Sequence, residues 1–321
     1  MPVERHPRTL LFQVKGEPAG AISSRISACS NSEVFMTTEE RRTGESQGER
    51  TSVDYALGYT DAEHDRLIRQ AARIAPITER LFREAGIGPG QRVLDVGSGV
   101  GDVAMLVARM VSPSGEVVGV ERDVNSVAQA RSRAATAGFR NVNFMQTEIT
   151  EFSSDKPFDA VVGRFILMFL PDPLAVLRSV YGLLRPGGVM AFQEPSWIPL
   201  VALSARIPLW SKVVSSIHET FLRSGVNTEM GLDLGRIFQH VGLPAPAMHM
   251  EMALGSDEAF ISLVSGLMIS VQGLARREGI SLDELGNLDT LANRIRAEVA
   301  ASGTVVGFVP MVGAWSRKQT P

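Results

Sequence analysis

The N-terminal part of the chain has almost no regular hydrophobic pattern. Residues 1–54 show neither helical nor strand periodicity, and residues 37–51 are almost wholly polar and charged. Such a segment cannot bury enough apolar surface to offset the entropy of ordering it, so we predict a disordered leader over residues 1–54. Met36 opens a tract typical of a protein start, and we hypothesise that translation begins there. N-terminal sequencing of native protein that found Met1 or Pro2 would contradict this.

Regular periodicity begins near Tyr55. Thr60 and Glu63 form a capping-box pattern, in which a hydroxyl and a carboxylate three residues apart satisfy free N–H groups at a helix start. Apolar residues then recur at helical spacing as far as Leu81. We predict a cap helix over residues 60–84, as the first element of one domain that spans residues 55–318.

From Arg92 onward, short apolar strands alternate with amphipathic helices. This alternation is typical of a parallel sheet with crossover helices, and it predicts a doubly wound α/β domain whose cofactor-binding core covers residues 91–195. The predicted strands are 92–96, 116–121, 141–147, 158–163 and 188–193, and the predicted helices are 103–111, 125–137 and 173–184.

After Pro195 the rhythm changes to longer helices with two further strands. Residues 247–253 alternate methionines with His249 and Glu251, which predicts a half-buried strand with the methionines inward. A last strand over residues 304–315 must contain a bulge or a break at Pro310, because proline cannot donate to a sheet. The prediction is a mostly parallel seven-stranded sheet with helical lid insertions at 196–246 and 256–303, containing helices 209–224, 234–240, 256–277 and 281–301.

Composition narrows the possible partners. The 321 residues carry a formal charge of −3, which favours no polyanion and predicts no nucleic-acid partner. The single cysteine, Cys29, excludes an intrachain disulfide and a Cys-based metal cluster. No uninterrupted apolar run approaches the ~20 residues of a membrane span. We therefore expect a cytoplasmic protein with no metal site and no membrane partner, and a homodimer stays open.

A glycine-rich turn after the first core strand is the strongest chemical feature. Residues 93–101 read VLDVGSGVG, so Asp95 ends a strand and Gly97 begins a G-x-G-x-G turn. Glycines allow positive φ and let a ligand lie against the backbone. Dinucleotide sites use G-x-G-x-x-G instead. Glu121 ends the next strand at about the ~20-residue offset where a carboxylate accepts from ribose hydroxyls.

These residues resemble a known family. Residues 93–101 are similar to the first motif of class I S-adenosylmethionine-dependent methyltransferases, residues 183–188 (LLRPGG) to its L-[KR]-P-G-G turn, and residues 158–162 (FDAVV) to its F-D-x-V strand. The resemblance covers roughly residues 60–195 and is nearest to small-molecule enzymes of quinone biosynthesis and secondary metabolism. It implies a Rossmann-like methyltransferase fold and S-adenosylmethionine as cofactor.

The resemblance also implies roles for individual positions. The glycine turn would line the methionine part of the cofactor, Glu121 would bind the ribose, and Arg122 would pack near the adenine. Glu148 stands where the family usually has an aspartate that accepts from the adenine amino group, so its geometry departs from the pattern. The implied cofactor-binding residues are Tyr59 (on the lid), Asp95, Gly97, Ser98, Gly99, Gly101, Glu121, Arg122, Glu148, Ile149, Gly163 and Arg164.

Acceptor chemistry is less visible in the sequence. Positioning alone can supply ~7–11 kcal/mol to a bimolecular reaction, so a methyltransferase needs no general base. His218 is the best candidate for a base, although a core histidine bonded to a neighbouring group is the more common role for such a position. Phe165, Glu194 and Trp197 follow the fourth and fifth strands, where open α/β sheets place ligands, and are predicted to line the substrate pocket.

The predicted function is methyl transfer from S-adenosylmethionine to a small, largely apolar molecule. The main alternative is a non-methylating member of the same fold, which binds the cofactor for another reaction or for ligand sensing. A nicotinamide-dependent oxidoreductase is disfavoured by the glycine spacing and by the lack of an evident Tyr-x-x-x-Lys pair.

Overall fold

The computed structural model describes Gly58 and residues 60–320. The predicted leader over residues 1–54, the Met36 start hypothesis and the lid residue Tyr59 lie outside the described residues.

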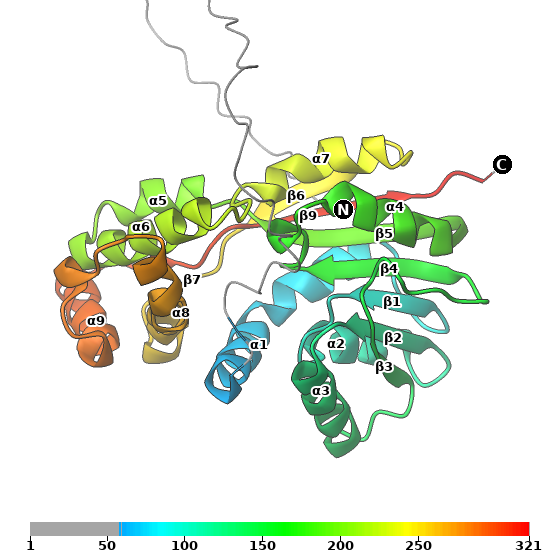
Figure 1. Cartoon of the computed structure of the whole chain (residues 1–321), viewed down its shortest axis with the longest axis horizontal. Coiled ribbons are helices and arrows are strands. Elements are labelled where there is room, and N and C mark those ends of the chain that lie inside the picture. The colour runs from blue at the N-terminus through cyan, green and yellow to red at the C-terminus, as the bar shows by residue number, and fades with distance from the viewer. Residues whose placement is uncertain (1–57, 59, 321) are drawn as a thin grey trace, which may run out of the picture. The chain divides into compact units, whose positions relative to one another are not determined.

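A seven-stranded sheet forms the centre of the described chain (Figure 1). Its order is β3-β2-β1-β4-β5-β9-β6, and β9 alone runs against its neighbours, so the predicted mostly parallel seven-stranded sheet is confirmed. The strands are β1 (Arg92–Val96), β2 (Glu116–Glu121), β3 (Val142–Gln146), β4 (Phe158–Arg164), β5 (Leu184–Pro195), β6 (Ala247–Glu251) and β9 (Met311–Arg317).

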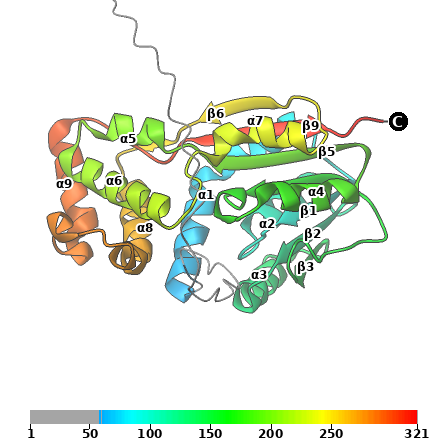
Figure 2. The same ribbon diagram turned by 45° about the horizontal axis from the view of Figure 1, so that its top comes forward.

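Helices cover both faces of this sheet. On one side lie α1 (Asp61–Glu84), α2 (Asp102–Val111) and α3 (Val124–Thr136), and on the other lie α4 (Pro173–Leu183) and α7 (Met230–His240) (Figures 1 and 2). Strand side chains alternate between the two resulting cores, because successive residues of a strand point to opposite faces. Val93 packs with α2 and α3, whereas its neighbour Leu94 joins the core of the other face.

The lid helices gather at one end of the sheet (Figures 1 and 2). They are α5 (Ile198–Ser204), α6 (Pro208–Arg223), α8 (Glu258–Arg277) and α9 (Leu291–Ser302), with a small two-stranded sheet of β7 (Leu254–Gly255) and β8 (Val306–Gly307). The sequence pattern had not indicated α5.

The prediction for the last part of the lid is wrong in detail. The helix predicted over 281–301 is two short 3-10 turns, Asp283–Leu285 and Leu288–Thr290, followed by α9. The cause is Gly286, whose φ of 61° a right-handed helix cannot accommodate.

The methionines of β6 also face the opposite way from the prediction. Met248 and Met250 are 40% and 44% exposed, whereas the ring of His249 packs on that of Trp315 with centroids 5.6 Å apart. A period of two reveals that a strand has two faces, but on an edge strand it does not reveal which face the neighbours bury.

Of the bulge or break predicted at Pro310, the structure has the break. The strand stops after Gly307 and resumes at Met311, and the carbonyl of Pro310 accepts from the backbone N–H of Ser196 at 3.0 Å. This interruption brings the end of β5 beside the segment that joins β8 to β9, which contributes to the site described below.

One helix modifies the expectation about membrane spans. In length and composition α8 is apolar enough to cross a bilayer, and it is the one described helix that passes this test. Of the most apolar stretch of α8, 56% is buried, and the helix packs against α1, α6 and α9. The burial explains the composition, because a helix that is covered on several sides needs apolar residues around most of its circumference.

Candidate active site

The glycine loop and the turn after β4 meet where the strand order reverses. β1 and β4 are adjacent, and the chain leaves them toward opposite sides of the sheet, which is where open α/β sheets bind ligands. Gly97, Gly99 and Gly101 all adopt positive φ, at 64°, 51° and 88°. The backbone conformation therefore explains why glycine stands at each of the three positions, as predicted.

Glu121 holds this loop in shape. One of its carboxylate oxygens accepts from the backbone N–H of Gly99 at 3.0 Å, and the other accepts from that of Asp123 at 2.9 Å. The loop is also tied to β2, because the N–H of Ser98 donates to the carbonyl of Val120 at 3.0 Å. A carboxylate offers about four lone-pair sites, so Glu121 keeps capacity for a ligand hydroxyl.

Charged groups lie beneath the loop. Asp95 is 1% exposed, and one of its carboxylate oxygens has no hydrogen-bond partner among the described residues. Burial raises the pKa of this carboxyl to about 8, although Arg164 acts in the opposite direction. Arg164 donates to the hydroxyl of Thr78 at 2.9 Å, and Thr78 in turn donates to Gln193 at 2.7 Å. Burial lowers the pKa of Arg164, and the carboxylates of Asp102 and Asp95 act in the opposite direction.

Glu194 shapes the site without facing it, which corrects the prediction that it lines the pocket. It is fully buried, and its carboxylate accepts from three successive backbone N–H groups, those of Ile166 (3.0 Å), Leu167 (2.9 Å) and Met168 (3.3 Å). The preceding residue, Phe165, has a φ of 54°, which is costly for a bulky side chain. The carboxylate therefore fixes a strained turn after β4, and that turn presents Phe165 and Met168 to the cavity.

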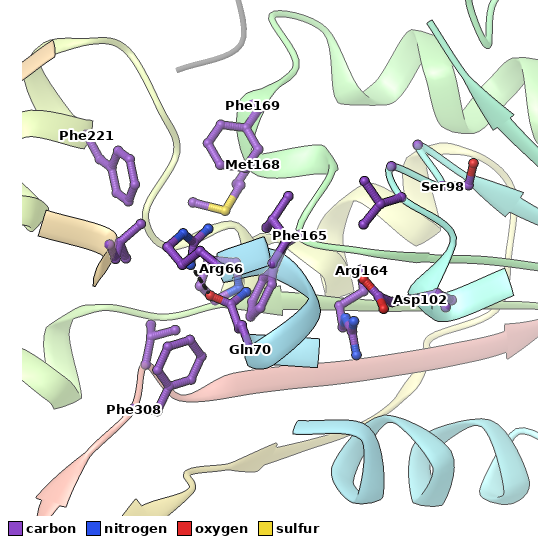
Figure 3. Close-up of a pocket in the computed structure, with 18 of the residues that line it drawn as sticks. Arg66, Gln70, Ser98, Asp102, Arg164, Phe165, Met168, Phe169, Phe221 and Phe308 are labelled. Atoms are coloured by element: carbon purple, nitrogen blue, oxygen red, sulfur yellow. Dashed lines mark hydrogen bonds between the residues drawn. The ribbon is translucent and has the colours of Figure 1, made fainter. Parts of the chain in front are cut away.

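A cavity runs from the glycine loop to a group of aromatic rings (Figure 3). The rings come from separated parts of the chain: Phe165 and Phe169 follow β4, Phe221 belongs to α6, and Phe308 precedes β9. Of the predicted site residues, those that line this cavity are Gly97, Ser98, Gly99, Arg164, Phe165 and Trp197.

His218 lies behind the cavity wall. Its ring stacks on that of Trp197, with centroids 5.9 Å apart and an interplanar angle of 7°, and its Nε2 is 3.1 Å from the hydroxyl of Thr228. It is not among the cavity-lining residues, and burial lowers its pKa. This geometry fits a structural role for His218, as a histidine bonded within the core, better than a role as general base. The role as base stays a prediction.

The remaining predicted cofactor residues lie around the loop rather than on the cavity. Arg122 and Glu148 are 4.0 Å apart on the surface, with side chains 37% and 53% exposed, and Ile149 packs against the core. Gly101 and Gly163 leave no room for a side chain, since a Cβ would lie 2.8 Å from Phe144 and 2.5 Å from Phe192 respectively. Their proposed contacts with the cofactor stay predictions.

Two polar cavity residues on α1 were not predicted from the sequence. Arg66 and Gln70 line the cavity and are one helical turn apart. Thr60 caps α1 as predicted, by accepting from the N–H of Glu63 at 3.2 Å. The side chain of Glu63, however, binds Arg66 instead of closing the capping box. Polar residues on the otherwise apolar face of a helix were the signal that could have revealed them.

Comparison with known proteins agrees with this geometry. The sequence profile of a family described as a methyltransferase domain matches residues 87–240. A demethylmenaquinone methyltransferase of Staphylococcus aureus strain JH9 is 28% identical over 176 residues, which cover 51% of this chain and 72% of that protein. The crystal structure of a candidate methyltransferase from Bacillus halodurans C-125 has the same fold, with a TM-score of 0.50 and 18% identity over 75% of this chain and 98% of that chain.

The sheet order, the glycine loop and these matches define a protein of the class I methyltransferase fold. Residues 87–240 therefore match a methyltransferase domain, in agreement with the resemblance of the glycine loop to S-adenosylmethionine-dependent enzymes.

Proposed function

We propose that this chain binds S-adenosylmethionine at the glycine loop and transfers its methyl group to a small, largely apolar molecule. The observation that carries the proposal is that Gly97 and Gly99 line the same cavity as the rings of Phe165, Phe169 and Phe308. A cofactor on the loop would direct its reactive end toward a ring-lined chamber that a largely apolar molecule would fill favourably. The name of the Staphylococcus aureus relative, which refers to a quinone, supports the same class of acceptor.

The residues around the loop fit the cofactor. Its ribose hydroxyls would donate to the carboxylate of Glu121, and its adenine would lie between Arg122, Glu148 and Ile149. Arg164 would pair with the carboxylate of the methionine part, because it is a cation in the cavity wall on the side of the glycine loop. When bound, the cofactor supplies a methyl group that is already activated for displacement.

The protein would then act mainly by orientation. The only carboxylate among the cavity-lining residues of the described chain is Asp102, and it is paired with Arg133 at 2.6 Å. The cavity wall thus offers no free base, and positioning of the acceptor between the rings is the main contribution that these residues can make. We further propose a cytoplasmic enzyme that acts on a small molecule and on neither nucleic acid nor membrane.

Calorimetric titration with S-adenosylmethionine and S-adenosylhomocysteine tests the cofactor site. Glu121→Ala should weaken both affinities by about 10–150-fold, because it removes charge-assisted hydrogen bonds to the ligand as well as the anchor of Gly99. Glu116→Ala is the matched control, since Glu116 is at the other end of β2 and pairs with Arg92 at 2.8 Å. If the folded wild-type protein binds neither ligand, the proposed function is wrong.

Variants at two loop glycines can distinguish a loop that binds the cofactor from a loop that is only a structural turn. A Cβ on Gly99 would meet nothing within 4 Å, whereas one on Gly97 would lie 2.5 Å from Ile166. Gly99→Ala should therefore cost only about 1–2 kcal/mol of stability, from its positive φ, yet reduce cofactor affinity at least about tenfold by filling the space where the ligand lies. Gly97→Ala should cost more stability. Denaturant melts and calorimetry check both, and unchanged affinity in folded Gly99→Ala would place the cofactor elsewhere.

Turnover distinguishes the enzyme from the non-methylating alternative. Release of S-adenosylhomocysteine in the presence of an acceptor is expected of a methyltransferase, whereas a cyclase or a sensor would bind the cofactor and leave it unchanged.

A further inference from the structure

The apolar cavity contains one polar feature that the proposed function leaves unused. Arg66 and Gln70 extend from α1 among the rings of Phe165 and Phe308 (Figure 3). Both side chains are buried, at 4% and 8% exposure. Desolvating a guanidinium and an amide is costly, so their presence in such a cavity calls for partners.

The protein satisfies these two side chains only in part. Arg66 donates to both carboxylate oxygens of Glu63, at 2.7 and 2.6 Å, and to the side-chain amide oxygen of Gln70 at 2.7 Å. A guanidinium has five N–H donors, so two of them have no partner among the described residues. The amide nitrogen of Gln70 likewise donates to no described residue. The unused groups are all donors, and a ligand beside them must supply acceptors.

The pair is also built to stay in place. The carboxylate of Glu63 that holds Arg66 is itself 2% exposed, and it accepts from the hydroxyl of Ser270 on α8 at 2.5 Å. The aliphatic part of Arg66 lies beside Gly266 of α8, where an added Cβ would be 3.5 Å from the Cγ of Arg66. Arg66 is therefore fixed between two helices, as specific recognition of a ligand requires.

Arg66 and Arg164 occupy different parts of the cavity. In Figure 3, Arg164 lies on the side of Ser98 and Asp102, near the glycine loop, whereas Arg66 and Gln70 lie on the side of the phenyl rings. The carboxylate of the cofactor would thus be within the region of Arg164. The donors of α1 are left to the molecule that fills the ring-lined part.

We propose that the methyl acceptor carries a hydrogen-bond-accepting oxygen, as a carbonyl, phenolate or carboxylate, which Arg66 and Gln70 bind while its apolar body packs on the rings. The proposal rests on the proposed function and makes it more specific, since it assigns the selection of the acceptor to two residues of α1. It also fits a cavity wall without a free base, because an acceptor with an anionic oxygen needs no proton removed from that oxygen.

The test compares three probes that share one ring system. Ligand-observed NMR titrations of 2-naphthoate, 2-naphthol and 2-methylnaphthalene are performed on protein saturated with S-adenosylhomocysteine. We expect the wild type to bind naphthoate at least about tenfold more tightly than methylnaphthalene, with naphthol between them. Glu63→Gln/Arg66→Met, which removes the charge pair as a unit, should reduce this preference to about twofold or less. Gln70→Leu leaves the pair intact and removes one neutral donor, so it should reduce the preference by about threefold.

Each outcome decides the proposal. Arg69→Met removes an exposed arginine of the same helix and should leave the preference unchanged. Equal binding of the three probes by the wild type, or a preference that survives in both variants, would overturn the inference. Weaker binding of S-adenosylhomocysteine in the variants would also overturn it, by showing that Arg66 serves the cofactor. Failure of the wild type to bind S-adenosylhomocysteine at all would instead contradict the proposed function.

Discussion

Replacing Glu194 with alanine should lower the free energy of unfolding by at least about 3 kcal/mol, because it leaves three backbone N–H groups, two of them on buried residues, without an acceptor. Those groups belong to the turn of Ile166, Leu167 and Met168, so the wall of the acceptor chamber should loosen as well. Equilibrium urea unfolding measures the first effect, and probe binding in the ring-lined cavity measures the second.

Glu194→Gln is the matched control for this experiment. Its amide keeps an oxygen for Ile166 and Leu167 and loses only the longest bond, at 3.3 Å to Met168. We expect the glutamine variant to lose at most about half as much stability as the alanine variant. Equal losses in the two variants would contradict the view that hydrogen bonding to this turn is what Glu194 contributes.

The same pair of proteins should differ in pH dependence. Burial outweighs the three donors and raises the pKa of Glu194 from 4.5 to about 7. Between these pH values the folded protein keeps a proton that the unfolded chain has released. The contribution of this bound proton to the stability of the folded protein is therefore complete below about pH 4.5, and it is lost as the pH rises through 7.

The stability difference between wild type and Glu194→Gln should accordingly shift by about 3 kcal/mol over that range, against the wild type at high pH. Asp95, whose pKa is also raised, gives a slope of the same sign, and His218, whose pKa is lowered, gives the opposite one. Both are present in the two proteins, so subtraction removes them. Parallel pH profiles would show that Glu194 does not titrate in this window.

Arg66→Met alone should destabilise the protein by about 3–5 kcal/mol. It leaves the carboxylate of Glu63, which is 2% exposed, buried without its cationic partner. In Glu63→Gln/Arg66→Met no buried charge remains, and the hydroxyl of Ser270 can still bond to the new amide. We expect the double variant to recover most of the loss.

A double-mutant cycle measured by urea unfolding checks this expectation. The coupling between Glu63 and Arg66 should be at least about 2 kcal/mol, which is much larger than the usual value for an exposed ion pair. The pair Glu79 and Arg83, on the exposed part of the same helix, provides that comparison. Additive effects at Glu63 and Arg66 would show that the buried pair does not act as a unit.

Much of the fold could be predicted because its determinants are local. The strands β1 and β2 have the predicted limits, and α4 differs from its prediction by one residue, since apolar periodicity and turn residues act over a few positions. The glycine loop belongs to the same class of feature. Each of its glycines has the positive φ for which glycine is needed, and Glu121 lies beside it because β1 and β2 are parallel neighbours.

Only the tertiary structure decided which side chains face the cavity. The sequence indicates a carboxylate at the end of β5, but the three N–H groups that make Glu194 a clamp come from a turn some 26–28 residues earlier in the chain. Likewise, a periodic pattern identifies α1 as amphipathic without showing that Arg66 meets Glu63 and Ser270 in a buried network. Periodicity is a property of single elements, whereas burial and hydrogen bonding depend on neighbours that are distant in sequence.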